Sequence, residues 1–78
     1  MDAEKRFELL EQIGKQLQDM RNVNPYIGIG DLEVVFIDTD GEEAEFGVGL
    51  AIASLAGDVY IFESFDLRDA HSAEVRVI

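Results

Sequence analysis

Apolar residues in the first quarter of the chain recur at spacings of three and four, which places them on one stripe of a helix. The positions on this stripe are Ala3, Phe7, Leu10, Ile13, Gly14, Leu17 and Met20. Asp2 suits the N-cap, and Asn24 is disfavoured in a helix because it precedes Pro25. The pattern predicts an amphipathic helix over residues 2–22. A glycine inside a helix costs up to about 1 kcal/mol, so we expect a strand to cross closely at Gly14.

From residue 31 the apolar pattern changes to alternation, which is typical of strands. Leu32, Val34 and Phe36 alternate with other residues, and the return strand is predicted over residues 42–55, with Ala44, Phe46, Val48, Leu50 and Ile52 on the same face. A three-residue loop, Thr39-Asp40-Gly41, pairs Phe36 with Ala44 and keeps the apolar face uniform, whereas a two-residue loop mixes the faces. It also places Gly41 at the left-handed bulge position.

The opposite face of this predicted hairpin carries glutamates near the turn and small residues farther along. The glutamates are Glu33, Glu43 and Glu45, beside Val35 and Ile37. The small residues are Gly47, Gly49, Ala51 and Ala53, a tract that permits another backbone to approach closely.

The rest of the chain predicts two further strands. Residues 59–65 alternate after a turn at Gly57-Asp58, where loops of two and three residues fit almost equally well. A polar connector over residues 66–71 follows, with one helical turn capped by Asp66. Residues 73–78 are predicted to form the last strand. The predicted fold class is therefore α+β: a single domain, residues 1–78, with one N-terminal amphipathic helix packed on a three- to four-stranded antiparallel sheet (α-β-β-β-β), the acidic β-meander covering residues 31–66.

Composition narrows the class of protein. The 78 residues are 47% hydrophobic, enough to fold despite a formal net charge of −11, and there is no cysteine. The charged N-terminus does not resemble a signal peptide, and no apolar run approaches the roughly 20 residues of a membrane span. We expect a cytoplasmic protein, in the host cytoplasm if it is phage-encoded. The negative charge disfavours direct contact with nucleic acid and with membranes.

Three candidate sites lack residues that their chemistry requires. Gly28-Ile29-Gly30 lacks the remaining glycines and the following helix of a phosphate-binding loop, so these are turn residues. The acids of residues 38–43 resemble half of a calcium loop, but the first and closing ligand positions fall on Phe36 and Gly47. His71 has no orienting partner for nucleophilic catalysis. We expect neither an enzyme nor a metal or cofactor site.

The remaining candidate is the carboxylate cluster. Residues 22–67 contain ten carboxylates and no lysine or arginine. Such a surface either keeps a small protein soluble or imitates the phosphates of a duplex and occupies the basic site of a nucleic-acid-binding protein. The partner-binding residues predicted under the second hypothesis are Glu33, Asp38, Asp40, Glu42, Glu43 and Glu45, with Glu63 and Asp66 as a second patch.

In size and acidity the whole chain is similar to small phage inhibitors of nucleic-acid-dependent defence, such as anti-CRISPR and anti-restriction proteins. That resemblance implies an inhibitor whose partner is a basic, nucleic-acid-binding protein. The helix followed by an acidic meander also resembles the opening half of the dimeric chaperones of type III secretion. This alternative implies a homodimer or scaffold that binds through the apolar sheet residues Val35, Ile37, Val59 and Ile61. A toxin-neutralising immunity protein is a third alternative, with one cognate partner.

Overall fold

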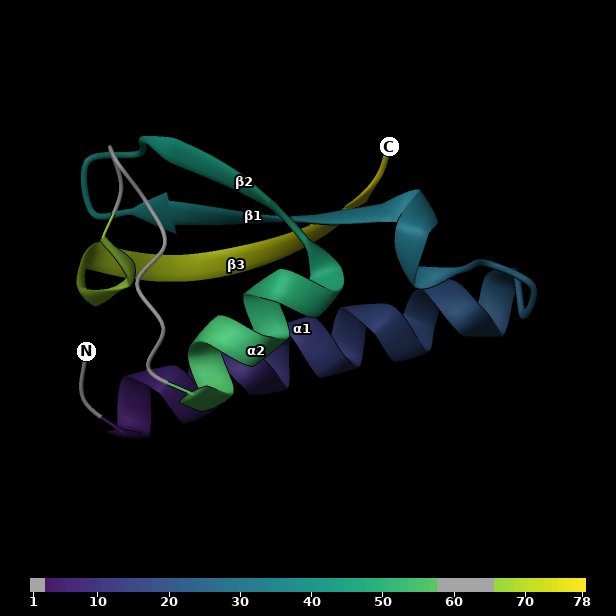
Figure 1. Ribbon diagram of the computed structural model, residues 1–78, viewed down its shortest axis with the longest axis horizontal. Coiled ribbons are helices and arrows are strands. Elements are labelled where there is room, and N and C mark those ends of the chain that lie inside the picture. The colour runs from purple at the N-terminus through teal and green to yellow at the C-terminus, as the bar shows by residue number, and fades with distance from the viewer. Residues whose placement is uncertain (1–2, 58–65) are drawn as a thin grey trace.

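The computed structural model describes residues 3–57 and 66–78 (Figure 1). Its elements are helix α1 (Ala3–Val23), a 3-10 turn η1 (Ile29–Asp31), strands β1 (Leu32–Asp38) and β2 (Glu43–Gly47), helix α2 (Val48–Gly57), a 3-10 turn η2 (Leu67–Asp69) and strand β3 (Ala70–Val77). The three strands form one antiparallel sheet in the order β2-β1-β3. Both helices cover the same face of this sheet. The predicted α+β class and N-terminal helix are confirmed.

The β1-β2 hairpin has the predicted register. Phe36 pairs with Ala44, and Val34 pairs with Phe46. Gly41 has a φ of 84°, the left-handed conformation that the bulge position requires. Asp38 fixes the loop, because its Oδ1 accepts hydrogen bonds from the Asp40 N–H at 2.8 Å and the Glu42 N–H at 2.9 Å.

The predicted continuation of the return strand to residue 55 is wrong, because the chain turns into α2 after Gly47. Val48, Ala51 and Leu55 are buried at helical spacing against the sheet. Every residue from 48 to 57 is apolar or small, so alternation and helical periodicity both fit the sequence. Alanine and leucine favour the helix, which buries one side of the segment in the core. The predicted strand over residues 59–65 lies outside the described residues.

The C-terminal strand is confirmed and begins three residues before its predicted start, at Ala70 rather than residue 73. It pairs with β1, so that Val34 lies opposite Val75 and Val35 opposite Glu74. The helical turn η2 before it is also as predicted, with the Asp66 side chain accepting the Arg68 N–H at 2.9 Å.

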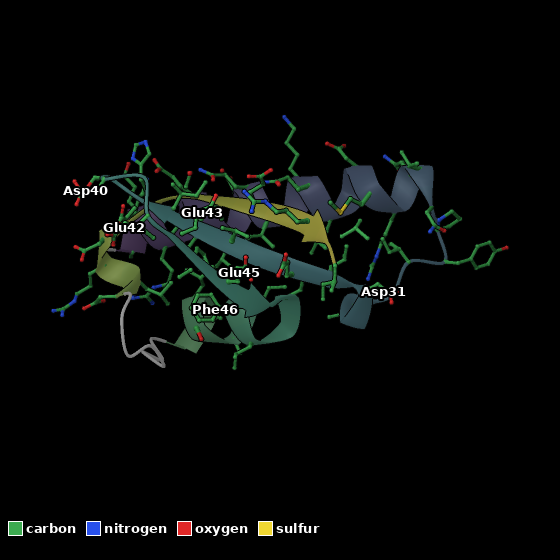
Figure 2. All side chains as sticks on the ribbon, turned by 90° about the horizontal axis from the view of Figure 1, so that it is seen from above. Asp31, Asp40, Glu42, Glu43, Glu45 and Phe46 are labelled. Atoms are coloured by element: carbon green, nitrogen blue, oxygen red, sulfur yellow. The ribbon has the colours of Figure 1, made fainter. Side chains whose placement is uncertain are left out.

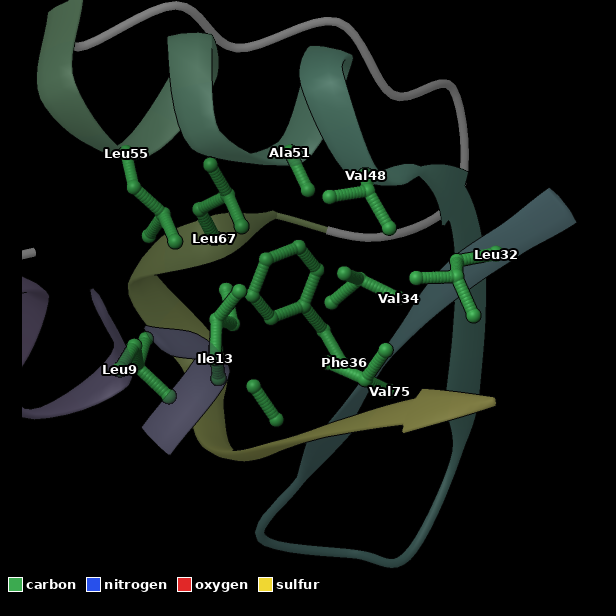
Figure 3. Close-up of a cluster of buried hydrophobic side chains, with 12 residues drawn as sticks. Leu9, Ile13, Leu32, Val34, Phe36, Val48, Ala51, Leu55, Leu67 and Val75 are labelled. Carbon is green, nitrogen blue, oxygen red and sulfur yellow. The ribbon is translucent and has the colours of Figure 1, made fainter. Parts of the chain in front are cut away.

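Phe36 lies at the centre of the core, between the helices and the sheet (Figure 3). The other buried members of this cluster are Leu9, Ile13, Leu32, Val34, Val48, Ala51, Leu55, Leu67, Ala70, Ala73 and Val75. The buried side of α1 is rotated from the predicted stripe, because Leu9 is fully buried whereas Phe7 is 62% exposed. Leu10, Leu17 and Met20 of that stripe pack against the cluster while partly buried.

Side chains of α1 also cap the outer edge of β3. Gln12 Oε1 accepts the Ala73 N–H at 2.9 Å, and Gln16 bonds both Ala73 O (2.9 Å) and the Val75 N–H (2.7 Å). The two amides supply the hydrogen bonds that a fourth strand would supply. They therefore protect an edge strand that is otherwise a template for pairing with another chain.

Gly14 does not mark the close strand crossing predicted from the sequence. A Cβ built on Gly14 meets no atom within 4 Å, and the residue is exposed in the middle of α1. Gly14→Ala should therefore raise the free energy of unfolding by about 1 kcal/mol, because alanine loses less backbone entropy in a helix. Urea denaturation of the two proteins would measure the gain. Gly41→Ala is the control of opposite sign, since its φ of 84° disfavours any side chain; destabilisation by Gly14→Ala would contradict the open environment.

Candidate functional site

The outer face of the sheet, turned away from both helices, is acidic. Because side chains alternate along a strand, burial of Val34 and Phe36 in the core places Glu33 and Val35 on the opposite face. The register then places Glu43 and Glu45 of β2 and Glu74 of β3 on that same outer face. We call Glu33, Glu43, Glu45 and Glu74 the acidic face.

Arg76 is the one basic residue on the described part of this face, and it is held in place by two carboxylates. Its Nη2 donates to Glu43 Oε1 and to Glu74 Oε2, at 3.0 Å each. Hydrogen bonds with Glu43 and then Glu74 raise the pKa of Arg76 above its ordinary value. Arg76 thereby offsets part of the repulsion among the glutamates that the three strands place on this face.

Val35 is fully buried although it lies on the outer face. Arg76 of β3 lies opposite Glu33 of β1. Its ion-pair partner, Glu43 of β2, lies opposite Ile37 of β1. Arg76 and Glu43 therefore meet above the central strand, near Val35. Of the apolar residues expected to serve a scaffold, Val35 is covered, Ile37 is half-buried, and Val59 and Ile61 lie outside the described residues.

The tip of the hairpin extends the acidic face. Asp40 and Glu42 are exposed there, while the half-buried Asp38 uses its carboxylate to hold the loop. Figure 2 shows Asp40, Glu42, Glu43 and Glu45 following one another from the loop along β2. All six carboxylates predicted as the first patch therefore lie on one hairpin, and five of them project from its outer face or tip.

The predicted second patch consists of Glu63, which lies outside the described residues, and Asp66. Both oxygens of the Asp66 carboxylate bond within the turn η2. Oδ1 accepts the Arg68 N–H, and Oδ2 pairs with the Arg68 guanidinium. These bonds, first the one from the Arg68 side chain, lower the pKa of Asp66 below 3.8. Asp66 is a helix-capping residue in this structure.

This pKa shift predicts a pH-dependent contribution to stability. A carboxyl group whose pKa is lower in the folded protein stabilises the fold above its unfolded pKa, and this contribution disappears as the pH falls through the folded value. Asp66→Asn should therefore be less stable than wild type at pH 6, and the difference should shrink below about pH 3.8. Denaturant titrations across this range would test it; a pH-independent difference would show that Asp66 acts without its charge.

Other chemistry gains no support from the residues that the structure describes. Within residues 3–57 and 66–78, no three His, Asp or Glu side chains converge as a metal site. His71 is exposed on β3, and its carbonyl accepts the Lys5 ammonium at 2.6 Å. Gly28 lies in a turn where its N–H donates to Asp31 Oδ2 at 3.0 Å. None of the described helices is both long and apolar enough to span a bilayer.

Sequence reasoning did not place Glu74 in the acidic face or Arg76 beside it. Their alternation with Ala73, Val75 and Val77 indicates which side of β3 they occupy. What the alternation does not reveal is that β3 pairs with β1, which places Glu74 across Val35 from Glu45.

Comparison with known proteins does not assign the chain to a family. No protein-family model, no curated protein and no solved structure matches it.

Proposed function

We propose that this protein is a non-enzymatic inhibitor whose acidic hairpin occupies the basic, nucleic-acid-binding surface of a partner protein. The observation that carries the proposal is the distribution of charge over residues 31–47, which contain seven carboxylates and no basic residue. Residues 32–47 form a single hairpin, and most of its carboxylates project from its outer face or its tip.

The fold gives this charge a rigid support. The inner face of the hairpin is anchored in the core through Val34 and Phe36, and the two rings Phe36 and Phe46 pack with centroids 5.7 Å apart. Carboxylates on a fixed sheet keep their spacing, as phosphates on a duplex do, so little order has to be gained on binding. An anionic surface of this kind steers a basic partner to itself and loses affinity as salt rises.

The test is a charge-neutralising triple variant, Glu42→Gln, Glu43→Gln and Glu45→Gln. The wild-type protein is used to capture partners from a bacterial lysate, and each captured protein is then purified and its affinity measured at two salt concentrations. We expect the triple variant to bind at least about tenfold more weakly and to show a smaller dependence on salt. Excess duplex DNA should displace the wild-type protein from its partner.

Helix α1 offers a matched control with the same change of charge. Glu4, Glu8 and Glu11 are exposed there, so their replacement by glutamine also removes three negative charges. If the control weakens binding as much as the hairpin variant, net charge alone drives association. If neither variant changes binding, or duplex DNA does not compete, the hairpin is not a nucleic-acid mimic.

A further inference from the structure

Gln12 and Gln16 of α1, which we call the glutamine ladder, bond to the backbone of β3 at Ala73 and Val75. The ladder does not reach Val77, the last residue of the strand. Four residues of helix advance by about 6 Å, and two residues of strand advance by about 6.6–6.8 Å, so the two elements stay in step. Gln12 therefore meets Ala73, and Gln16 meets Ala73 and Val75. The next position on the helix is Met20, whose side chain offers no amide to Val77.

The backbone of Val77 is consequently an open hydrogen-bonding position. The N–H and C=O of alternate residues point to the same side of a strand, so Val77 faces outward as Ala73 and Val75 do. Ile78 points the other way, since its N–H donates to Asp31 O at 3.0 Å. No side chain in the described part of the chain bonds to the Val77 backbone, and Val77 itself is 63% exposed.

An apolar groove lies beside this open position. It has a volume of about 470 Å³, and its lining residues are Asp19, Met20, Val23, Asn24, Ile27 and Val77. Val23, the last residue of α1, lies at its rim and is 88% exposed. An unpaired strand edge beside an apolar groove is the arrangement that receives an extended peptide by strand addition.

We propose that the end of β3 and this groove bind a short extended peptide segment of a partner protein, with an apolar side chain in the groove and a lysine or arginine beside it. The peptide backbone bonds to Val77, and its apolar side chain packs on Met20, Val23 and Ile27. Asp19 alone is charged among the described residues lining the groove, and it faces the basic side chain.

The charge of the protein favours a basic peptide segment in the groove over a second copy of the chain. Each copy carries a net charge of −11, so two copies repel one another, whereas a cationic segment is attracted. The site lies at the far end of β3 from the hairpin tip, because Val77 pairs with Leu32 and Ala70 pairs with Asp38. It can therefore be occupied independently of the tip.

The experiment is an NMR titration of the full chain with a capped six-residue peptide that alternates valine and lysine. At up to about 1 mM peptide we expect amide shifts at Val77 and methyl shifts at Val23 and Ile27, with hydrogen exchange of the Val77 amide slowed by about tenfold or more. A second peptide with serine in place of valine keeps the charge and should lose the groove shifts. Equal groove shifts with the serine peptide, or shifts confined to the acidic face, would overturn the proposal.

Two lysine variants separate the groove from general charge. Val23→Lys places a positive charge at the rim and should weaken valine–lysine peptide binding by about tenfold or more, whereas the neighbouring Asn22→Lys, outside the lining, should not. Met20→Gln extends the ladder, so it should protect the Val77 amide without peptide and prevent binding. Equal effects of the two lysine variants would overturn the proposal. Concentration-dependent broadening at Val77 in the free protein would assign the groove to a second copy instead.

Discussion

Replacing Phe36 with alanine should lower the free energy of unfolding by about 3–5 kcal/mol. Phe36 is fully buried on the central strand, and its ring contacts residues contributed by both helices and the sheet (Figure 3). A chain of 78 residues has a total stability of about 4–12 kcal/mol, so this single change removes a large share of it. Much of the variant should be unfolded at 37 °C.

Phe7→Ala provides the matched control for this prediction. It deletes the same atoms from a side chain that is 62% exposed on α1, and we expect it to cost less than about 1 kcal/mol. Circular dichroism during urea denaturation would measure both variants. A loss below about 1 kcal/mol for Phe36→Ala would mean that the cluster around this ring is not the principal core.

The elements that could be predicted from sequence are those in which polar residues separate the apolar ones. In α1 the charged residues leave a stripe at helical spacing, and Pro25 limits its end. In the first hairpin only the three-residue loop keeps Phe36 and Ala44 on one face. The same loop places Gly41 at the left-handed bulge position. Both elements are confirmed because local pattern and turn chemistry agree.

Helix α2 could not be distinguished from a strand, since residues 48–57 contain no charged position to identify an exposed side. Whether this segment forms a helix depends on the space above the hairpin, which Ala51 and Leu55 fill. The rotation of α1, which buries Leu9 and exposes Phe7, depends on the same packing. These are properties of the assembled core rather than of a local pattern.

The candidate site also contains residues that could be placed from the sequence and residues that could not. The hairpin fixes which acids share a face, so Glu33, Glu43 and Glu45 were placed together from sequence. Glu74 and Arg76 lie on β3, about 30 residues farther along the chain. Their position beside the other acids follows from the β1-β3 pairing alone. Because of this long-range pairing, the outer face of the sheet carries an arginine among its glutamates.

Replacing Gln16 with methionine should lower the free energy of unfolding by about 2 kcal/mol. Methionine has nearly the same length but forms neither of the two bonds that Gln16 makes to Ala73 O and the Val75 N–H. Both strand residues are more than nine-tenths buried, so water replaces these bonds poorly, and each lost bond costs about 1 kcal/mol. Hydrogen exchange of the Val75 amide should also accelerate by about tenfold or more.

Two further variants show whether the amide acts through both of its ends. Gln18→Met makes the same change at an exposed position, where the side chain bonds Asn22, and should cost less than about 0.5 kcal/mol. Gln16→Glu keeps an acceptor for the Val75 N–H but loses the donor to Ala73 O, so it should destabilise the protein while the Val75 amide stays protected. If Gln16→Met leaves both stability and exchange at Val75 unchanged, the glutamine ladder does not protect this edge, and the open position at Val77 would then be no different from the rest of β3.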